Sequence, residues 1–291
     1  MNNHHKGLLA IHSAVFIFGF TALFSKLIDL PALDITMLRS IITFLALGSF
    51  ILWQKQSLKL NSTKDYKIII VIGLLLALHW VTYFHAMQVS TIAIGVISLY
   101  TFPVITVFLE PMFHGEKPHI KDIISALLVF IGIYLLVPEF SLDNQMTQGI
   151  VWGFISAFLF ALRNILQGRY FKKYSAKQSL YYQSLITFIV LVPFSYEIVS
   201  EVTLNQWQQL FILGLFFTAL PHTLFAFSLL ELKAKTVSLI ACVHVVYATT
   251  FAILLLNEWP EISAIIGGVI IVATAMYESY TVKSTPKIID K

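Results

Sequence analysis

Arginine and histidine side chains occur inside segments of this sequence that are otherwise apolar. Arg163, followed by Asn164, lies two thirds of the way along the apolar segment 148–168. A guanidinium can donate two parallel hydrogen bonds to a carboxylate or a phosphate, so Arg163 predicts the recognition of an anionic group. The alternative is that its side chain extends toward lipid headgroups a few residues away. The sequence leaves both interpretations open.

Three histidines lie near the middle of other apolar segments: His79, His222 and His244. A histidine at that depth forms hydrogen bonds, carries a proton, or packs as a neutral core residue. Pro103 and Pro221 lie in the interior of their segments, where a kinked helix would border a cavity. Aromatic side chains at similar depth complete the candidate binding site. They are Trp80, Tyr83, Tyr100 and Tyr247.

The composition requires these side chains to be positioned by membrane-spanning helices. Of the 291 residues, 58% are apolar and only 12% are charged, and the mean hydropathy is +0.82. This is more apolar surface than one soluble core can bury, so we expect an all-α polytopic membrane protein. A helix of about 20 residues crosses a bilayer core of roughly 30 Å. Ten segments qualify: 7–28, 34–53, 66–88, 91–113, 121–138, 148–168, 178–198, 207–230, 235–256 and 262–281.

The distribution of Lys and Arg predicts the orientation of these segments. Of the 19 Lys and Arg residues, 16 lie at the termini or in alternate connections, and the opposite connections contain none. Basic residues stay on the cytoplasmic side, so we expect both termini in the cytoplasm and the chain in the bacterial inner membrane. The basic net charge therefore predicts contact with a lipid bilayer and not with nucleic acid.

Two further cations lie near the predicted outer ends of the first two segments. Lys26 and Arg39 could pair with Asp29 or Asp34 and close the outer side as a gate. Simple placement in the headgroup region is the other interpretation. A charged residue at mid-membrane costs about 2.5–3.5 kcal/mol, so an arginine in a span needs a structural or functional reason.

The second half of the sequence begins as a copy of the first. Gly149, Phe158 and Phe160 repeat the spacing of Gly7, Phe16 and Phe18. Five segments per copy is an odd number, so the second copy would be inverted. We expect two inverted five-helix repeats, 7–138 and 148–281, around a central cavity, which is the arrangement of an alternating-access carrier. Two further pairs match: 39–44 with 183–188, and Glu116-Lys117-Pro118 with Glu258-Trp259-Pro260.

Several short motifs resemble the EamA family of the drug/metabolite transporter superfamily over about residues 7–281. The resemblance implies that helices one to four and six to nine surround a central cavity, with helices five and ten at the periphery. It also implies transport of amino acids or other small metabolites. The chain departs from the family pattern at Phe18, where Trp is usual, and at Val245, where proline is usual. The motifs are Phe18-Gly19 with Lys26, Pro31, Arg39, Tyr100-x-x-Pro103, Gly115-Glu116, Asn257-Glu258 and Gly267-Gly268.

These features predict a secondary carrier of an amino acid or a similar zwitterionic or anionic solute. Export of drug-like or toxic organic compounds is the alternative. No segment has Asp or Glu at its middle, so proton coupling would use the histidines, or transport is facilitative. An intramembrane enzyme is disfavoured, because His79 and His85 do not share a helix face and a single cysteine, Cys242, forms no metal cluster, so we expect no metal and no cofactor. A channel is disfavoured because no interrupted half-span is visible in the sequence.

Overall fold

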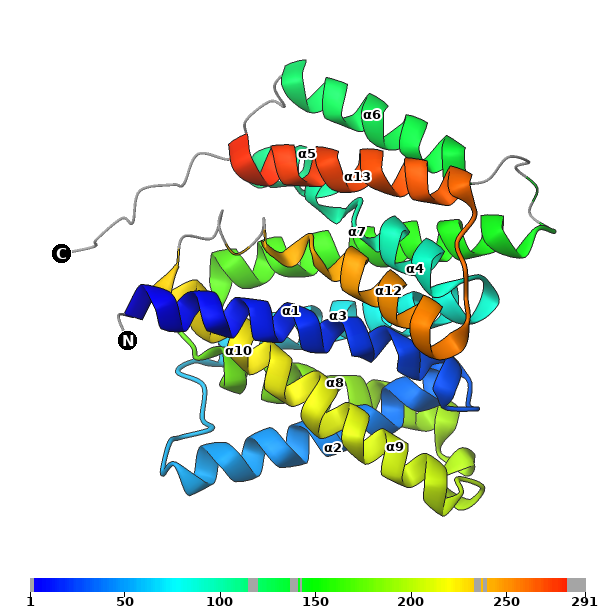
Figure 1. Ribbon diagram of the computed structural model, residues 1–291. Coiled ribbons are helices and arrows are strands. Elements are labelled where there is room, and N and C mark those ends of the chain that lie inside the picture. Colours follow the sequence, from blue (N-terminus) through cyan, green and yellow to red (C-terminus); the bar gives the residue numbers. More distant parts are fainter. Residues whose placement is uncertain are drawn as a thin grey trace.

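The computed structural model describes residues 3–114, 120–136, 141, 143–232, 237 and 240–281, and all regular structure in these ranges is helical (Figure 1). The turn predicted at Glu116-Lys117-Pro118 lies outside the described residues. The first half contains α1 (Asn3–Leu27), α2 (Ala32–Trp53), α3 (Thr63–Val89), α4 (Ile92–Leu99), α5 (Phe102–His114) and α6 (Ile120–Leu136). The second half contains α7 (Gln145–Tyr170), α8 (Ala176–Ser195), α9 (Leu204–Gly214), α10 (Leu220–Glu231), α12 (His244–Leu256) and α13 (Ile262–Thr281).

The polar residues between the apolar segments start the helices. Ser62, Asn144 and Ser175 each accept a hydrogen bond from a backbone N–H in the first turn of the following helix. Thr203 does the same and exchanges hydrogen bonds with Gln206, which forms a capping box. Such caps satisfy N–H groups that a helix leaves unpaired at its start. Most helix bounds therefore fall within a few residues of the predicted segments.

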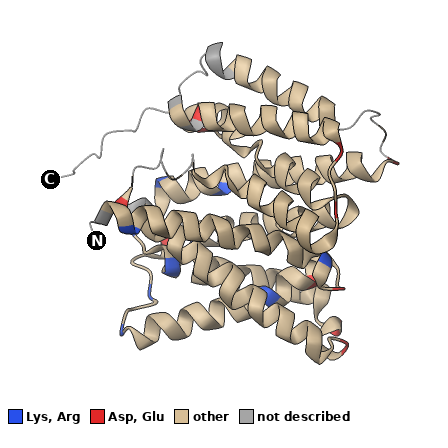
Figure 2. Cartoon of the chain, in the orientation of Figure 1, with Lys and Arg blue, Asp and Glu red and all other residues tan. Residues whose placement is uncertain are grey.

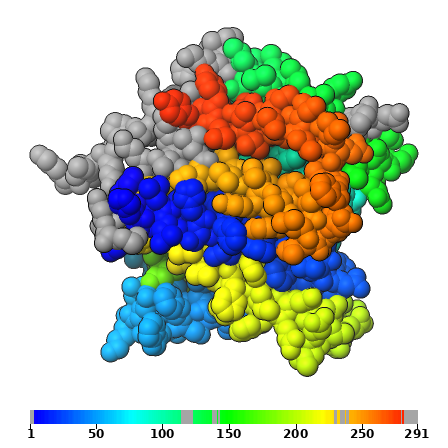
Figure 3. Space-filling view, viewed as in Figure 1, coloured from blue at the N-terminus to red at the C-terminus, as the bar shows by residue number. Residues whose placement is uncertain are grey.

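Length and composition allow six of the described helical segments to cross a membrane. They are His4–Leu27, Ala32–Trp53, Thr63–Val89, Ile92–Phe113, Gln145–Tyr170 and Leu204–Ser228. Shorter apolar helices cover Ile123–Leu136, His244–Leu256 and Ile262–Glu278. Charged residues gather at the two ends of the bundle and leave its long sides largely uncharged (Figure 2). In the space-filling view, α1, α9, α10, α12 and α13 lie side by side on the face turned toward the reader (Figure 3). The prediction of a polytopic all-helical membrane protein is confirmed.

Two of the predicted spans are interrupted, which the sequence analysis did not predict. Span four breaks at Tyr100 and Thr101, between α4 and α5. Pro103 lies in the first turn of α5, where a proline is tolerated because its missing N–H is not needed. Span nine turns at Cys242–Val243, directly before α12. The expectation that no span is interrupted was therefore wrong, and with it the argument against a channel that rested on it.

The two interruptions meet in the centre of the bundle. The Tyr100 hydroxyl, at the end of α4, donates a hydrogen bond of 2.5 Å to the carbonyl of Ala241, just before α12. A second irregularity lies in span eight, where a π-helical stretch, Leu215–Ala219, joins α9 to α10. It precedes Pro221 in the first turn of α10. Broken helices at membrane depth are tolerated where other protein groups satisfy their free carbonyls.

The helices of the two halves interlock in a repeated pattern. Segments that correspond in the two halves pack on each other: α2 on α8, α4 on α12, and α6 on α13. The packing of α3 on α7 is repeated by that of α10 on α1. The α6–α13 pair lies at one edge (Figure 1), where a Cβ on Gly267 would come within 2.5 Å of the Gly132 carbonyl oxygen. Small residues at such a crossing let two membrane helices approach closely.

Candidate functional site

Aromatic rings and histidines from both halves meet where the broken helices cross. Ring contacts join Phe18 to His222 (4.8 Å between centroids), His79 to Phe160 (4.6 Å), and Tyr100 to His244 (5.7 Å). Further contacts link these pairs into one group, which we call the central cluster. Its members are Phe18, His79, Trp80, Tyr83, Tyr100, Phe102, Phe160, His222 and His244.

His79 is held by the backbone and side chain of Ser156 on α7. Its Nδ1 lies 2.7 Å from the Ser156 hydroxyl and 3.2 Å from the Ser156 carbonyl. The Ser156 hydroxyl donates in turn to the carbonyl of His79 at 3.0 Å. Because that hydroxyl has a single proton, Nδ1 of His79 must be the donor to Ser156, and Nε2 is the acceptor nitrogen.

His222 and His244 are fixed in the same way by backbone carbonyls. Nδ1 of His222 lies 2.7 Å from the carbonyl of Thr218 in the π-helical stretch. Nε2 of His244 lies 3.1 Å from the carbonyl of Phe18. A carbonyl only accepts, so each histidine donates from the named nitrogen and keeps the other as an acceptor. All three histidines are therefore packed and hydrogen-bonded inside the bundle. Each still has one ring nitrogen that can accept a further hydrogen bond.

The central cluster repeats the internal symmetry of the sequence. Phe160 follows Phe18 by 142 positions, and His244 follows Phe102 by the same number. His79 stacks on Phe160 of the other half, and His222 contacts Phe18 of the other half. The arrangement therefore brings corresponding residues of the two halves to one place. Phe160 was not predicted for the site, although its offset from Phe18 would have identified it.

Arg163 lies in a polar network between α7 and α8. Its Nε donates to Oε1 of Gln183 at 2.8 Å, and its Nη1 donates to Oδ1 of Asn164 at 2.8 Å. The amide nitrogen of Gln183 donates on to Gln167 and Ser179. The guanidinium is therefore hydrogen-bonded by neutral groups.

Arg39 lies deeper in the bundle than predicted and has a different environment. It is 2% exposed, and its guanidinium carbon lies 4.3 Å from the ring centroids of both Trp80 and Phe84 on α3. Its Nε and Nη2 have no hydrogen-bond partner among the residues that the structure describes. The Tyr83 hydroxyl is also buried without a partner in that part of the chain. Phe84 was missed because a sequence does not show which helix face meets a neighbour.

The expected pairing of Lys26 and Arg39 with Asp29 or Asp34 was wrong. Lys26 donates to the carbonyls of Gln88 (3.3 Å) and Ser90 (2.8 Å), and Asp34 accepts a hydrogen bond from Ser195. Arg39 lies seven residues inside α2, about 10 Å along the helix, where it faces α3. Lys26 and Arg39 therefore have separate surroundings, and their role as an outer gate stays a prediction.

Tyr247 and an apolar groove between α2 and α9 lie outside the central cluster. Tyr247 packs against Phe16 on α1, with 5.4 Å between the ring centroids. A groove of about 850 Å³ lies between α2 and α9, and residues such as Ile42, Leu45 and Phe211 line it. Leu45 and Phe211 are each 54% exposed, so this is an apolar surface of the kind that faces lipid.

Polar contacts join the two halves at both ends of the bundle. At the lysine-rich end, Asp65 forms a salt bridge of 2.9 Å with Lys173 and accepts a hydrogen bond of 2.7 Å from the Tyr174 hydroxyl. These hydrogen bonds lower the pKa of Asp65 to about 2. At the opposite end, Glu258 accepts a hydrogen bond of 2.9 Å from the N–H of Ile92, in the first turn of α4. Burial raises the pKa of Glu258.

Two interlocking helical halves, broken helices that meet at their centre, and a buried cluster drawn from both halves define a secondary membrane transporter. The chain belongs to the EamA-like transporter family, whose model matches residues 5–137 and 147–278. The resemblance seen in the sequence is therefore confirmed, as is the expectation that the chain is not an enzyme. A solved crystal structure covers 96% of this chain and 98% of its own at 16% identity, with a TM-score of 0.64, which shows the shared fold.

Named relatives transport different compounds. An uncharacterized transporter, YxxF, of Bacillus subtilis is 24% identical over 88% of this chain and 84% of its own length. The pseudopaline exporter CntI of Pseudomonas aeruginosa is 24% identical over 87% of this chain and 88% of its own. An S-adenosylmethionine uptake transporter of Rickettsia bellii is 22% identical over 72% of each chain. CntI and the S-adenosylmethionine transporter therefore differ from each other in both the solute and the direction of transport.

Proposed function

We propose that this transporter carries an amino acid, or a similar zwitterionic or anionic metabolite, across the bacterial inner membrane by alternating access. The two repeats, 7–138 and 148–281, would open the central cluster to opposite sides, with both termini in the cytoplasm. The excess of Lys and Arg at one end of the bundle supports this orientation. His79, Trp80, Tyr83, Tyr100, His222 and His244 are the proposed binding residues. Arg163, with its hydrogen-bond partner Asn164, is proposed to add positive charge beside them.

The charge of the centre carries the proposal. Arg39 contacts Trp80 of the central cluster, with 4.3 Å between its guanidinium carbon and the ring centroid, and Arg163 lies three residues after Phe160 on α7. The one salt bridge between described residues is that of Lys173 with Asp65, at the end of the bundle, so neither of these arginines is paired with a described carboxylate. A solute with a carboxylate would balance this positive charge, while the surrounding rings would contact its apolar part.

The relatives support the class of solute. Two of them are named for pseudopaline export and S-adenosylmethionine uptake. S-adenosylmethionine carries an amino-acid carboxylate, which is consistent with an anion-binding group in the central site.

Solute counterflow tests this function. Purified protein in phospholipid vesicles is preloaded with one unlabelled amino acid at a time, and uptake of the same labelled amino acid is followed. We expect preloading to accelerate the early uptake of at least one amino acid, because a carrier returns faster when loaded. Uptake that grows in proportion to concentration and ignores preloading would indicate a channel. Absence of uptake for all twenty amino acids would contradict an amino acid as the solute.

A further inference from the structure

Arg39 is the buried cation that its surroundings satisfy least. It is 2% exposed, and neither Nε nor Nη2 has a hydrogen-bond partner among the described residues. Buried N–H groups in folded proteins are almost always hydrogen-bonded, and an unpaired buried charge is strongly unfavourable. A buried cation under these conditions needs a partner beyond the described residues, and a bound solute can supply one.

The two unpaired nitrogens lie on one edge of the guanidinium plane. The Nε–H and one Nη2–H point in the same direction, and this pair of donors matches the two oxygens of a carboxylate. The guanidinium carbon lies over the rings of Trp80 and Phe84, at 4.3 Å from each ring centroid. Trp80 and Phe84 are four residues apart and so share one face of α3. The rings stabilise the cation by cation–π contact, but they have no oxygen that could accept two parallel hydrogen bonds.

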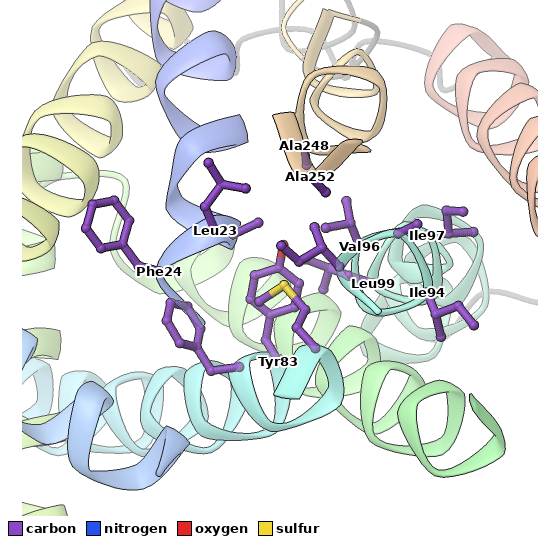
Figure 4. Close-up of a cluster of buried hydrophobic side chains, with 14 of the residues drawn as sticks. Leu23, Phe24, Tyr83, Ile94, Val96, Ile97, Leu99, Ala248 and Ala252 are labelled. Atoms are coloured by element: carbon purple, nitrogen blue, oxygen red, sulfur yellow. The ribbon is translucent and has the colours of Figure 1, made fainter. Parts of the chain in front are cut away.

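Tyr83 offers a second donor on the same helix. Its hydroxyl is buried without a partner among the described residues, and its ring lies 6.0 Å from that of His79. Figure 4 shows Tyr83 among apolar side chains such as Leu23, Val96 and Leu99. These apolar neighbours have no side-chain group that accepts a hydrogen bond. Tyr83 precedes Phe84 and follows Trp80 by three residues on α3, and both of those rings contact the guanidinium of Arg39.

We infer that Arg39 is the carboxylate anchor of the transported solute, with Tyr83 as a second donor to that solute. This inference rests on the proposed function and assigns Arg39 to the solute site instead of the outer gate. Arg163, in contrast, already donates to Gln183 and Asn164. The solute class that fits is a carboxylate attached to an apolar or aromatic body.

Variants of Arg39 test the inference by transport and by stability together. Arg39→Gln, Arg39→Lys and wild type are compared in counterflow with each amino acid that wild type transports, and with the carboxamide of that amino acid. We expect Arg39→Gln to weaken the apparent affinity for the amino acid about 30-fold or more, since hydrogen bonds to charged groups are the strong ones. Arg39→Lys keeps the charge but loses the fork, so its loss should also be large. Wild type should reject the carboxamide, and Arg39→Gln should no longer distinguish the two.

The thermal denaturation midpoint of the solute-free protein separates misfolding from loss of the anchor. Replacing an unpaired buried charge by a neutral group is expected to leave this midpoint unchanged or to raise it. Arg39→Gln with wild-type affinity, or with wild-type discrimination against the carboxamide, overturns the inference while the proposed function stands.

A second experiment, which does not measure transport, covers the case in which no amino acid is transported. Sodium acetate, benzoate and succinate are then compared with sodium chloride for thermal stabilisation of wild type and Arg39→Gln. We expect at least one carboxylate to stabilise wild type and not the variant. Equal responses of the two proteins to all three carboxylates overturn the inference, whereas failure of counterflow alone contradicts only the proposed function.

Discussion

Each half of the protein has one arginine inside a helical span: Arg39 is buried, Arg163 is half-buried, and the two have opposite surroundings. Arg163 donates to the side-chain oxygens of Gln183 and Asn164, both at 2.8 Å. Arg39 is covered by two aromatic rings and has two N–H groups without a described partner. In the internal repeat, Gln183 occupies the position that corresponds to Arg39. The second half therefore has an amide where the first half has a cation, and this amide accepts a hydrogen bond from another cation, Arg163.

The guanidinium of Arg163 is already hydrogen-bonded, whereas that of Arg39 has two N–H groups available to bind a ligand. A hydrogen-bonded arginine contributes to the packing of α7 on α8, while an unpaired one raises the free energy of the empty protein and is suited to a ligand. Symmetry of the fold thus does not imply symmetry of the binding chemistry. The first half can supply the arginine that binds the solute, while the arginine of the second half stabilises helix packing.

The largest effect is expected from exchanging the two repeat-related residues. The double variant Arg39→Gln/Gln183→Arg moves the guanidinium to the corresponding position of the other half, beside Arg163. We expect the apparent affinity to fall about 30-fold or more, as in Arg39→Gln alone. The denaturation midpoint should also fall, because two cations then face each other. Counterflow and thermal denaturation measure both changes. Recovery of wild-type affinity would show that the two positions are equivalent.

Arg163→Gln should affect stability more than binding. It removes hydrogen bonds to Gln183 and Asn164, together worth about 2–4 kcal/mol, and should lower the midpoint by about 4 °C or more. We expect the affinity to change less than about threefold. Asn164→Ala is the matched control, because it removes one of the two acceptors and keeps the charge. A loss of affinity as large as that of Arg39→Gln would restore Arg163 as the anion-binding residue that its sequence position predicted.

The lysine-rich end should lose stability in acid. The hydroxyl of Tyr174 and the ammonium of Lys173 lower the pKa of Asp65 from the ordinary 3.8 to about 2. A lowered folded-state pKa stabilises the folded protein above the unfolded pKa, and this contribution is lost as the pH falls toward 2. Asp65→Asn should therefore lower the midpoint by a few degrees at neutral pH, and its difference from wild type should shrink in acid. Thermal denaturation from pH 7 to pH 3, with Lys173→Met as control, measures this. A difference independent of pH would contradict the assignment.

The opposite end should respond to pH in the other direction, and with the smallest effect. Burial raises the pKa of Glu258, although the N–H of Ile92 and the charge of Lys26 act against the rise. We call this end closed when Glu258 is buried against the N–H of Ile92. Because Glu258 has a higher pKa in the closed state than in water, lowering the pH toward this raised pKa favours the closed state. Glu258→Gln should mimic the protonated state and still accept the hydrogen bond.

Closure is measured with the variant Thr91→Cys in a Cys242→Ser background. The rate at which a membrane-impermeant thiol reagent labels this cysteine reports how open this end is. We expect about twofold slower labelling in Glu258→Gln than in wild type at neutral pH. Slower labelling of wild type is expected in mild acid. Faster labelling in either case would show that the carboxylate holds this end closed only when it is charged.

Hydropathy predicted the helices well but not their interruptions. The segment predicted at 66–88 is a helix at Thr63–Val89, because length and apolar content are properties of the segment itself. The break at Tyr100 separates two parts that are equally apolar, so hydropathy does not detect it, although Pro103 indicated an irregularity. The similar break before α12 has no proline. It was not predicted because it depends on packing between the halves.

The candidate site was predicted in its residue types more than in its contacts. His79, Trp80, Tyr100, His222 and His244 do come together in the central cluster, because depth along a span can be counted from a sequence. The partners of each arginine depend on which helix faces α2 or α7, and one sequence does not show this. The roles of all these residues in transport stay a prediction.

The hydrogen bond between Tyr100 and Ala241 has a mechanical consequence. It connects the backbone interruptions of the two halves, and its acceptor is a carbonyl next to a turn and not one within a continuous helix. Separating the two interruptions therefore breaks one bond, at a net cost of about 1 kcal/mol, without unwinding a helical turn. The rocking of one half against the other that we propose would therefore break this contact without a loss of helical hydrogen bonds.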